Sequence, residues 1–334
     1  MPSSILRNKN RVGLVGFNCA TGNGIQNYQI LKYGGIDSWL IIPHKRYGVR
    51  PSPDGISTFI RRSRQDEDDF LETVDTIVFV ETPFYEGMLN KAKERGKRAV
   101  CVPNQEWLPR KLRSWCSQVD LFLCPTQHCF DIVEDHLPAV LFPWPFETSR
   151  YQFQQRERCE RFLFLNGRGG VHGRKGIQTV SKAKKVWKEM PVITYSQRRD
   201  KYENLELLPP KEDNRDLYQE GDVLLLPHRV DGLGLEMLEA MSTGMPVIST
   251  NGLPWNEFPA LHRIASIAGR KQLSRLTRTV DWYFPSPKDL ANACERWHHQ
   301  DIREESLQCR QFAEERSWDK KAKQFRDLTR GEYE

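Results

Sequence analysis

Three carboxylates fall close together in the stretch DGLGLEMLEAMSTGMPVIST, and they are Asp231, Glu236 and Glu239. A buried apolar helix does not hold a carboxylate unless a partner compensates its charge. Because one carboxylate can accept hydrogen bonds from two hydroxyls, Glu239 inside the expected helix suits the hydroxyl pair of a ribose. Gly232 and Gly234 precede that helix and would let a phosphate approach its free N–H groups. The stretch therefore predicts a nucleotide site.

A second stretch, LNGRGGVHGRKGIQTV, combines glycines with the cations Arg168, Arg174 and Lys175 before a helix that opens near Gly176. Flexible backbone, cations and a helix N-terminus together suit a diphosphate. Lys175 is followed by glycine, so the P-loop pattern is not matched. A solvated basic turn is the alternative interpretation.

A third glycine-rich stretch, NCATGNG, places Gly22 and Gly24 after the first apolar run, where they would let an anion meet a helix N-terminus. It is not the dinucleotide fingerprint, because the expected acid is missing after the next strand. A tight turn without a ligand is the alternative.

Continuous apolar runs of strand length alternate with helical segments along the chain, which predicts parallel sheets covered on both faces. The runs of the first half are RVGLVGF, SWLIIP, TIVFVETP, RAVCVPN and LFLCPT, and those of the second half are FLFLNG, PVITYS, LELLPP, DVLLLPH and PVISTNG. Residues 306–330 are expected to form an amphipathic helical tail. The fold class is α/β with two parallel-sheet domains. Ligands of such sheets bind at the carboxyl ends of the strands, where all three stretches fall.

Composition sets the outer limits for the 334 residues. The sequence has no apolar run of membrane-spanning length and no secretory signal pattern, so membrane insertion is not expected. The eight cysteines include no CxxC pair, which favours reduced thiols and a cytoplasmic location over a structural zinc site.

The stretch from Asp231 onward resembles the signature of retaining nucleotide-sugar glycosyltransferases of the GT-B fold. NGRGGVHGRKG is similar to the Gly-Arg loop of that family, TGNGIQNY to its first glycine loop, and PHRVDG to its strand end before the acid. The resemblance implies two Rossmann-like domains facing a central crevice. The expected boundaries are 1–147 for the acceptor-side domain, 148–310 for the nucleotide-sugar domain, and 311–334 for a C-terminal helix that packs back on the first domain.

The resemblance also implies residue roles. Arg168 and Lys175 would neutralise the donor diphosphate, and Arg174 could take the part of Lys175. Glu239 would hold the ribose, and Asp231 would contact the transferred sugar in place of the usual Glu. The residues whose backbone amides would face phosphate or sugar are Gly232, Leu233, Gly234 and Leu235. The family often has a histidine near the transferred sugar, whereas the corresponding strand ends here offer Glu81, Asn104 and Glu106.

The implied reaction is transfer from a UDP- or GDP-sugar, with no cofactor and no metal, because cations and a helix N-terminus can stabilise the leaving diphosphate. The alternatives are a catalytically silent sugar-nucleotide-binding or partner-binding module and a sugar-phosphate epimerase of the same architecture. A saccharide or small molecule is the expected acceptor. A modified nucleic acid base is the alternative, because residues 44–64 combine Lys and Arg with Tyr47 and Phe59. Pairing of these cations with the acidic run that follows is the other interpretation of this segment.

Overall fold

The computed structural model describes residues 10–19, 21–45, 48–52, 54–83, 86–112, 114–168, 173–198, 201–202, 204–273 and 278–332. These residues form two compact units. The first contains the described residues of Met1–Pro125, Cys129–Pro143 and Trp318–Glu334, and the second those of Thr126–His128 and Trp144–Ser317.

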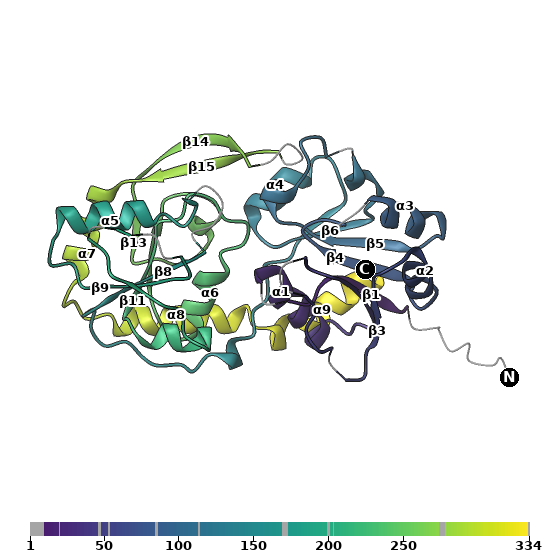
Figure 1. Ribbon diagram of the computed structural model, residues 1–334, viewed down its shortest axis with the longest axis horizontal. Helices are drawn as coiled ribbons and strands as arrows, with labels where there is room; N and C mark the ends of the chain where they lie inside the picture. Colours follow the sequence, from purple (N-terminus) through teal and green to yellow (C-terminus); the bar gives the residue numbers. More distant parts are fainter. Residues whose placement is uncertain are drawn as a thin grey trace. The chain divides into compact units, whose positions relative to one another are not determined.

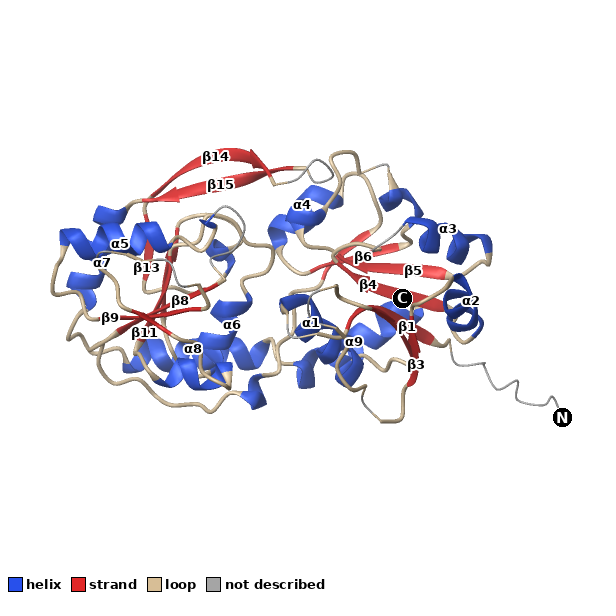
Figure 2. Ribbon diagram, in the orientation of Figure 1, coloured by secondary structure: helices blue, strands red, loops and turns tan. Residues whose placement is uncertain are grey.

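The first unit is built on a seven-stranded parallel sheet in the order β3-β2-β1-β4-β5-β6-β7 (Figures 1 and 2). Its strands are β1 Val12–Phe17, β2 Ser38–Ile42, β3 Ser57–Ile60, β4 Thr76–Val80, β5 Arg98–Val102, β6 Leu121–Cys124 and β7 Ala139–Leu141. Its helices are α1 Gly22–Tyr33, α2 Arg64–Glu72, α3 Glu86–Glu94, most of α4 Gln127–Val133, and α9 Trp318–Arg330. The C-terminal α9 packs on α1, where Trp318 stacks on Tyr33 at 5.6 Å and donates to Gln29.

The second unit is built on a six-stranded parallel sheet in the order β10-β9-β8-β11-β12-β13. Its strands are β8 Phe162–Gly167, β9 Val192–Ser196, β10 Leu207–Leu208, β11 Val223–Leu226, β12 Val247–Thr250 and β13 His262–Ile264. Its helices are α5 Ile177–Val186, α6 Leu235–Ser242, α7 Pro287–Trp297 and α8 Arg303–Glu315. A separate antiparallel ribbon joins β14 Ser266–Gln272 to β15 Thr279–Pro285 (Figure 2).

Both sheets reverse their strand order beside the first strand of the unit, between β1 and β4 and between β8 and β11. Chain connections leave such a point in opposite directions, so the loops that follow the two strands diverge and open a ligand site at the carboxyl edge. In the second unit these are the loops that lead into α5 and α6. They contain the two glycine-rich stretches singled out in the sequence.

The apolar runs expected as strands all form strands. Runs such as those of β1, β4, β8 and β11 are buried between helices on both faces of their sheet, whereas the edge strand β10 is only partly buried. Three short strands, β3, β7 and β13, and the antiparallel ribbon were not expected. The sequences of β3, β13 and β14 lack a continuous apolar run, and the apolar residues of β7 lie in a proline-rich segment. The prediction of a single helical tail is wrong in one respect, because the helix breaks at Arg316 and Ser317 into α8 and α9.

All eight cysteines are buried and none of them forms a disulfide, as the sequence predicts for reduced thiols. Burial raises the pKa of Cys101, Cys159, Cys294 and Cys309 above that of an exposed thiol. Within the described parts of the chain, the structure has no helix long and apolar enough to cross a membrane.

Candidate donor site in the second unit

The loop after β8 reaches α5 through Gly176, which adopts the left-handed conformation with φ of 79° and forms the N-cap. A Cβ atom at this position would lie 2.0 Å from the carbonyl oxygen of Pro227, so only glycine fits. This close approach brings the end of the loop after β8 against Pro227, which directly follows β11. It places Lys175 beside the second loop.

The loop after β11 enters α6 in the same way, through Gly234 with φ of 74° as the N-cap. Gly234 has no side chain with which to cap the helix. The N–H groups of Met237 and Leu238 bond to the Gly234 carbonyl, so a ligand would meet the N–H groups of Leu235 and Glu236. Such groups, together with the partial positive charge at a helix N-terminus, suit an anion.

Four ionisable side chains meet between the two loops. Lys175 Nζ lies 2.5 Å from Glu236 Oε1, and His228 Nε2 lies 3.2 Å from Glu236 Oε2. His228 Nδ1 lies 3.4 Å from Asp231 Oδ2. The imidazole is 1% exposed, so it is a buried bridge between two carboxylates that both belong to the DGLGLE stretch. These contacts explain how an apolar helix start tolerates Asp231 and Glu236.

The charges of this cluster shift the acidity of its carboxyl groups. Burial alone would raise the pKa of Glu236, but the charges of Lys175 and His228 outweigh burial and lower the pKa to about 2. Burial would likewise raise the pKa of Asp231, but the hydrogen bond with His228 and the charges of Lys175 and Arg174 hold it well below its usual range. Both groups are therefore ionised at neutral pH.

Glu239 is held by two tyrosines. Tyr151 Oη donates to Oε1 at 3.1 Å, and Tyr218 Oη donates to Oε2 at 2.5 Å. Burial raises the pKa of Glu239 above its ordinary value, and the neighbouring charge of Glu236 adds to the rise. The carboxylate still has acceptor capacity, because its two oxygens together accept about four hydrogen bonds.

A pocket of about 170 Å³ opens on Glu236 and Glu239. Its other walls come from the carboxyl ends of β8 and β9 and from the segment around Leu217. The remaining lining residues are Leu165, Gly167, Tyr195, Ser196, Gln197, Pro210, Asn214 and Tyr218. Apolar and aromatic walls with a few polar groups are typical of a site for a small organic ligand.

Other residues singled out in the sequence surround this pocket. The exposed Arg168 donates from Nε to Gln197 Oε1 at 2.8 Å, which places it at the pocket rim. The N–H groups of Gly232 and Leu233 donate to Asp231 Oδ1 at 2.9 and 3.4 Å, so in this structure they hold the loop. The expected contacts of Gly232–Leu235 with phosphate or sugar stay predictions. His172 lies outside the described residues.

The polar residues predicted for the first unit lie at the carboxyl edge of its sheet. Asn104 Nδ2 donates to Glu81 Oε1 at 3.0 Å, and Glu81 has a left-handed backbone with φ of 70°, which is uncommon outside glycine. Glu106 is buried in the turn that follows β5.

A Cβ atom on Gly24 would lie 1.9 Å from the Cys19 carbonyl, so close packing of the backbone requires glycine at this position. Gly22 is the first residue of α1.

Sequence reasoning gave no role to His228, Tyr151 or Tyr218. His228 has a recognisable signal, because it lies two residues after the end of β11 and three residues before Asp231. Tyr151 and Tyr218 have none, since each reaches Glu239 from a distant part of the chain.

Residues 187–260 match the sequence model of the family described as glycosyl transferases group 1. A search of curated proteins found no match. Sucrose-phosphate synthase from Thermosynechococcus elongatus is similar in structure, with a TM-score of 0.63, 13% identity, and coverage of 96% of this chain and 98% of that one. The UDP-forming α,α-trehalose-phosphate synthase from Burkholderia xenovorans has a TM-score of 0.62 at 10% identity, with coverage of 95% and 98%.

WaaG, a glycosyltransferase involved in lipopolysaccharide biosynthesis, superposes with a TM-score of 0.54 at 12% identity, with coverage of 95% of this chain and 99% of that chain. These likenesses cover both units and confirm the predicted GT-B fold.

Proposed function

We propose that this chain, a glycosyltransferase of the GT-B fold, moves a sugar from a nucleotide-diphosphate sugar to an acceptor hydroxyl with retention of configuration. The observation that carries the proposal is the contact of Lys175 with Glu236 at the N-terminus of α6. It supports a site in which a cation and two helix N-termini meet beside a pocket of about 170 Å³.

The donor diphosphate is assigned to Lys175, Arg168 and Arg174. Negative charge grows on the leaving diphosphate as the glycosidic bond breaks, so cations fixed beforehand stabilise the transition state more than the bound donor. Lys175 is paired with Glu236 in this structure and would exchange that partner for a phosphate oxygen. Because these cations can supply the stabilisation that a metal would give, we propose transfer without a metal.

The nucleoside is assigned to Glu239 and the adjoining pocket. Its carboxylate would accept both ribose hydroxyls in addition to the tyrosine hydroxyls that already hold it. Tyr195 and Leu217 offer flat apolar surface for the base of a UDP- or GDP-sugar. Asp231, which already accepts from the backbone of its own loop, would use its remaining lone pairs for a hydroxyl of the transferred sugar.

The acceptor is assigned to the first unit, with Glu81 and Glu106 as the groups that could take the proton of the reacting hydroxyl. The leaving phosphate is the other possible proton acceptor. Three amide side chains lie at this edge, and all three are nearly fully buried. They are Asn18, Asn104 and Gln105. Neutral amides suit the hydroxyls of a saccharide or another small polar molecule. Gly22 would let such a ligand approach the start of α1, whereas Gly24 is needed for the close approach of the Cys19 carbonyl.

A nucleic acid base is the second candidate acceptor, because Arg50, Arg62 and Arg64 are exposed in the basic segment. Two findings count against it. Arg61 pairs with Glu67 at 3.0 Å, and Phe59 lies in β3 with its ring packed against Phe70 instead of being free to stack on a base. Arg46 and Tyr47 lie outside the described residues.

The test is a mass-spectrometric screen of UDP- and GDP-sugars with saccharide acceptors, repeated with modified DNA and with a chelator. We expect turnover of one donor class, undiminished by the chelator, and NMR of the product should show a retained anomeric configuration. A donor that binds without hydrolysis or transfer would identify a silent binding module, and conversion of the donor without an acceptor would identify an epimerase. Failure of the protein to bind DNA at low salt would exclude the nucleic acid acceptor.

The eight buried reduced thiols support a reducing compartment, and we place the reaction in the cytoplasm.

A further inference from the structure

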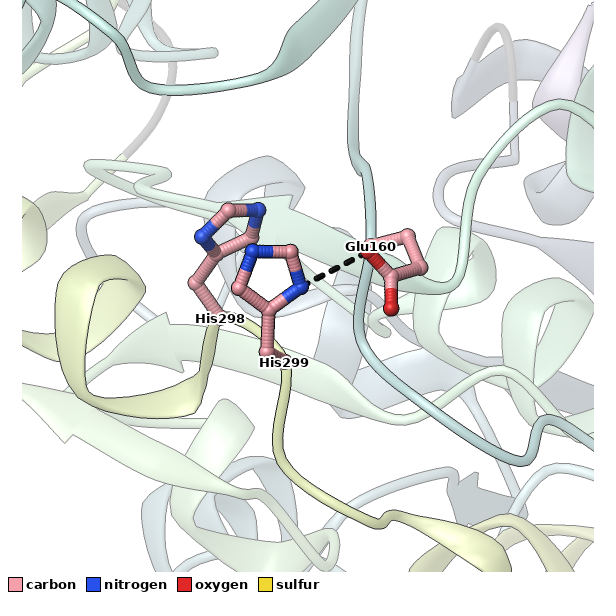
Figure 3. A group of neighbouring side chains, drawn as sticks. All are labelled: Glu160, His298 and His299. Atoms are coloured by element: carbon pink, nitrogen blue, oxygen red, sulfur yellow. Dashed lines mark ion pairs between the residues drawn. The ribbon is translucent and has the colours of Figure 1, made fainter.

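Two adjacent histidines and a glutamate meet on the second unit at the edge opposite the donor site. They are Glu160, His298 and His299, and Figure 3 shows the glutamate directed toward the histidine pair. Glu160 precedes β8, whereas the donor loop follows that strand. The six residues of β8 span roughly 20 Å, so the cluster is too far from the donor pocket to take part in transfer.

The three side chains are close enough to share one ion. Their donor atoms all lie within 4.8 Å of one another, and His299 Nδ1 lies 2.7 Å from Glu160 Oε2. Two ligand atoms on one tetrahedral Zn²⁺ are about 3.4 Å apart. Small rotations of the exposed side chains would therefore bring all three donors to coordination distance.

The backbone holds the two segments in place. His299 N–H donates to the Cys159 carbonyl at 2.8 Å, and Cys159 N–H donates to the Gln300 carbonyl at 3.0 Å. This short antiparallel pairing sets His299 opposite Glu160. His299 also has φ of 66°, a left-handed conformation that is uncommon for a residue other than glycine. The conformation that places the two imidazoles side by side, with ring centroids 3.6 Å apart, is therefore maintained by its surroundings.

The electrostatic setting favours a cation. His298 is the C-cap of α7, where the partial negative charge of the helix end attracts positive charge. The Trp187 ring packs on the edge of His298 at 5.3 Å and limits its rotation. Arg158 Nε lies 4.0 Å from Oε1 of Glu160, whereas Oε2 is the oxygen that faces His299.

We propose that Glu160, His298 and His299 bind a divalent transition-metal ion of the Zn²⁺ type, with water completing its coordination. Two imidazoles and one carboxylate are a ligand set that such ions prefer, whereas Mg²⁺ and Ca²⁺ prefer oxygen ligands alone. The ion would join the end of α7 to the segment before β8 and so stabilise this side of the unit. A surface ion pair between His299 and Glu160 is the simpler alternative, and it assigns nothing to His298.

The test is a competition titration of the purified full chain with Zn²⁺ and a chromophoric chelator, together with the absorption spectrum of the Co²⁺-loaded protein. The variants are H298A, H299A and E160Q. The matched control is H262A, because His262 lies 3.0 Å from Asp289 in the same unit and forms a similar pair without belonging to the three-residue group. All three ligand positions are at least partly exposed, so these variants should fold.

We expect one Zn²⁺ per chain, a thermal midpoint that rises with Zn²⁺, and a loss of affinity of more than about tenfold in each ligand variant but not in the control. Loss in H299A and E160Q without loss in H298A would reduce the cluster to an ion pair. Equal affinity in all four variants would also overturn the proposal. Because neither metal binding nor the thermal shift depends on transfer, the outcome is independent of the proposed reaction.

Discussion

The carboxyl edges of the two sheets have the same strand topology, but their loops carry side chains of different charge. In the second unit, the loops beside the strand reversal bring together Lys175, Glu236, His228 and Asp231. In the first unit, the corresponding edge carries buried amides together with the carboxylates Glu81 and Glu106, and Glu81 contacts the neutral Asn104. One strand order therefore supports an ionic site and a largely neutral polar site. The difference lies in the loop residues, which the packing of the sheet leaves free to vary.

The contrast supports a division of labour. A diphosphate has several negative charges and needs fixed cations, whereas a hydroxylated acceptor has none and needs hydrogen bonds. The ionic edge should therefore respond to loss of charge, and the amide edge to loss of hydrogen bonds. Four changes test this contrast.

Replacing Lys175 with methionine should have the largest effect. The change keeps the length of the side chain but removes its charge, so turnover should fall by about 10²- to 10³-fold while nucleoside affinity changes little. Arg168→Ala should act in the same direction. Steady-state kinetics with calorimetric titration of nucleoside, monophosphate and diphosphate would measure both quantities. Lys182→Met, at an exposed position on α5, is the control. Equal losses of affinity for all three ligands would contradict the assignment.

Replacing Glu239 with alanine should weaken donor binding by about 100-fold, which corresponds to about 3 kcal/mol. The change removes the ribose acceptor and leaves two buried tyrosine hydroxyls without their partner. Tyr151→Phe is the matched control, because it removes one of these hydrogen bonds and keeps the carboxylate. Unchanged nucleotide affinity in a folded Glu239→Ala protein would exclude the ribose role.

Acid should destabilise the ionic edge through Glu236. Its pKa is about 2 in the folded chain and 4.5 ordinarily, so its contribution to stability is complete above about pH 4.5 and is lost as the pH falls toward 2. Between pH 5 and pH 3 the loss should be about 2 kcal/mol. Urea unfolding at both values should show a smaller pH difference for Glu236→Gln than for the unaltered chain. An identical pH difference would mean that the ion cluster does not stabilise the fold.

The smallest effect is expected at the amide edge. Glu81→Gln keeps an acceptor for Asn104 but removes the charge, and we expect acceptor kcat/KM to fall by about tenfold with donor affinity unchanged. Glu94→Gln, at an exposed position on α3, is the control. A loss of about 10³-fold would instead make Glu81 the obligatory base, and a change in donor affinity would contradict the division of labour.

The sequence predicts the main strands and the α6 start because apolar runs and glycines are local signals. Val223–Leu226 is a continuous apolar run, and Gly234 directly precedes a run of helix-forming residues. The pairing of Lys175 with Glu236 could not be predicted in the same way. It depends on Gly176 approaching Pro227, a contact between segments far apart in the sequence.

The short elements were missed for a related reason. Residues 139–141 and 262–264 form strands only because a neighbouring strand offers unpaired backbone groups. Likewise, β14 has exposed residues such as Ile267, so its alternation carries little apolar signal. Where tertiary pairing decides the conformation, local propensity gives no warning.

The buried thiols give the molecule a built-in chemical reporter. Cys101, Cys116 and Cys124 belong to the first unit, and Cys159 and Cys294 to the second. A thiol shielded from reagent reacts only when its surroundings open, so its alkylation rate follows local or global unfolding. Mass spectrometry of the labelled peptides would thus give separate opening rates for the two units in the unmodified chain. Repeating the labelling with a nucleotide sugar would show which unit that ligand protects.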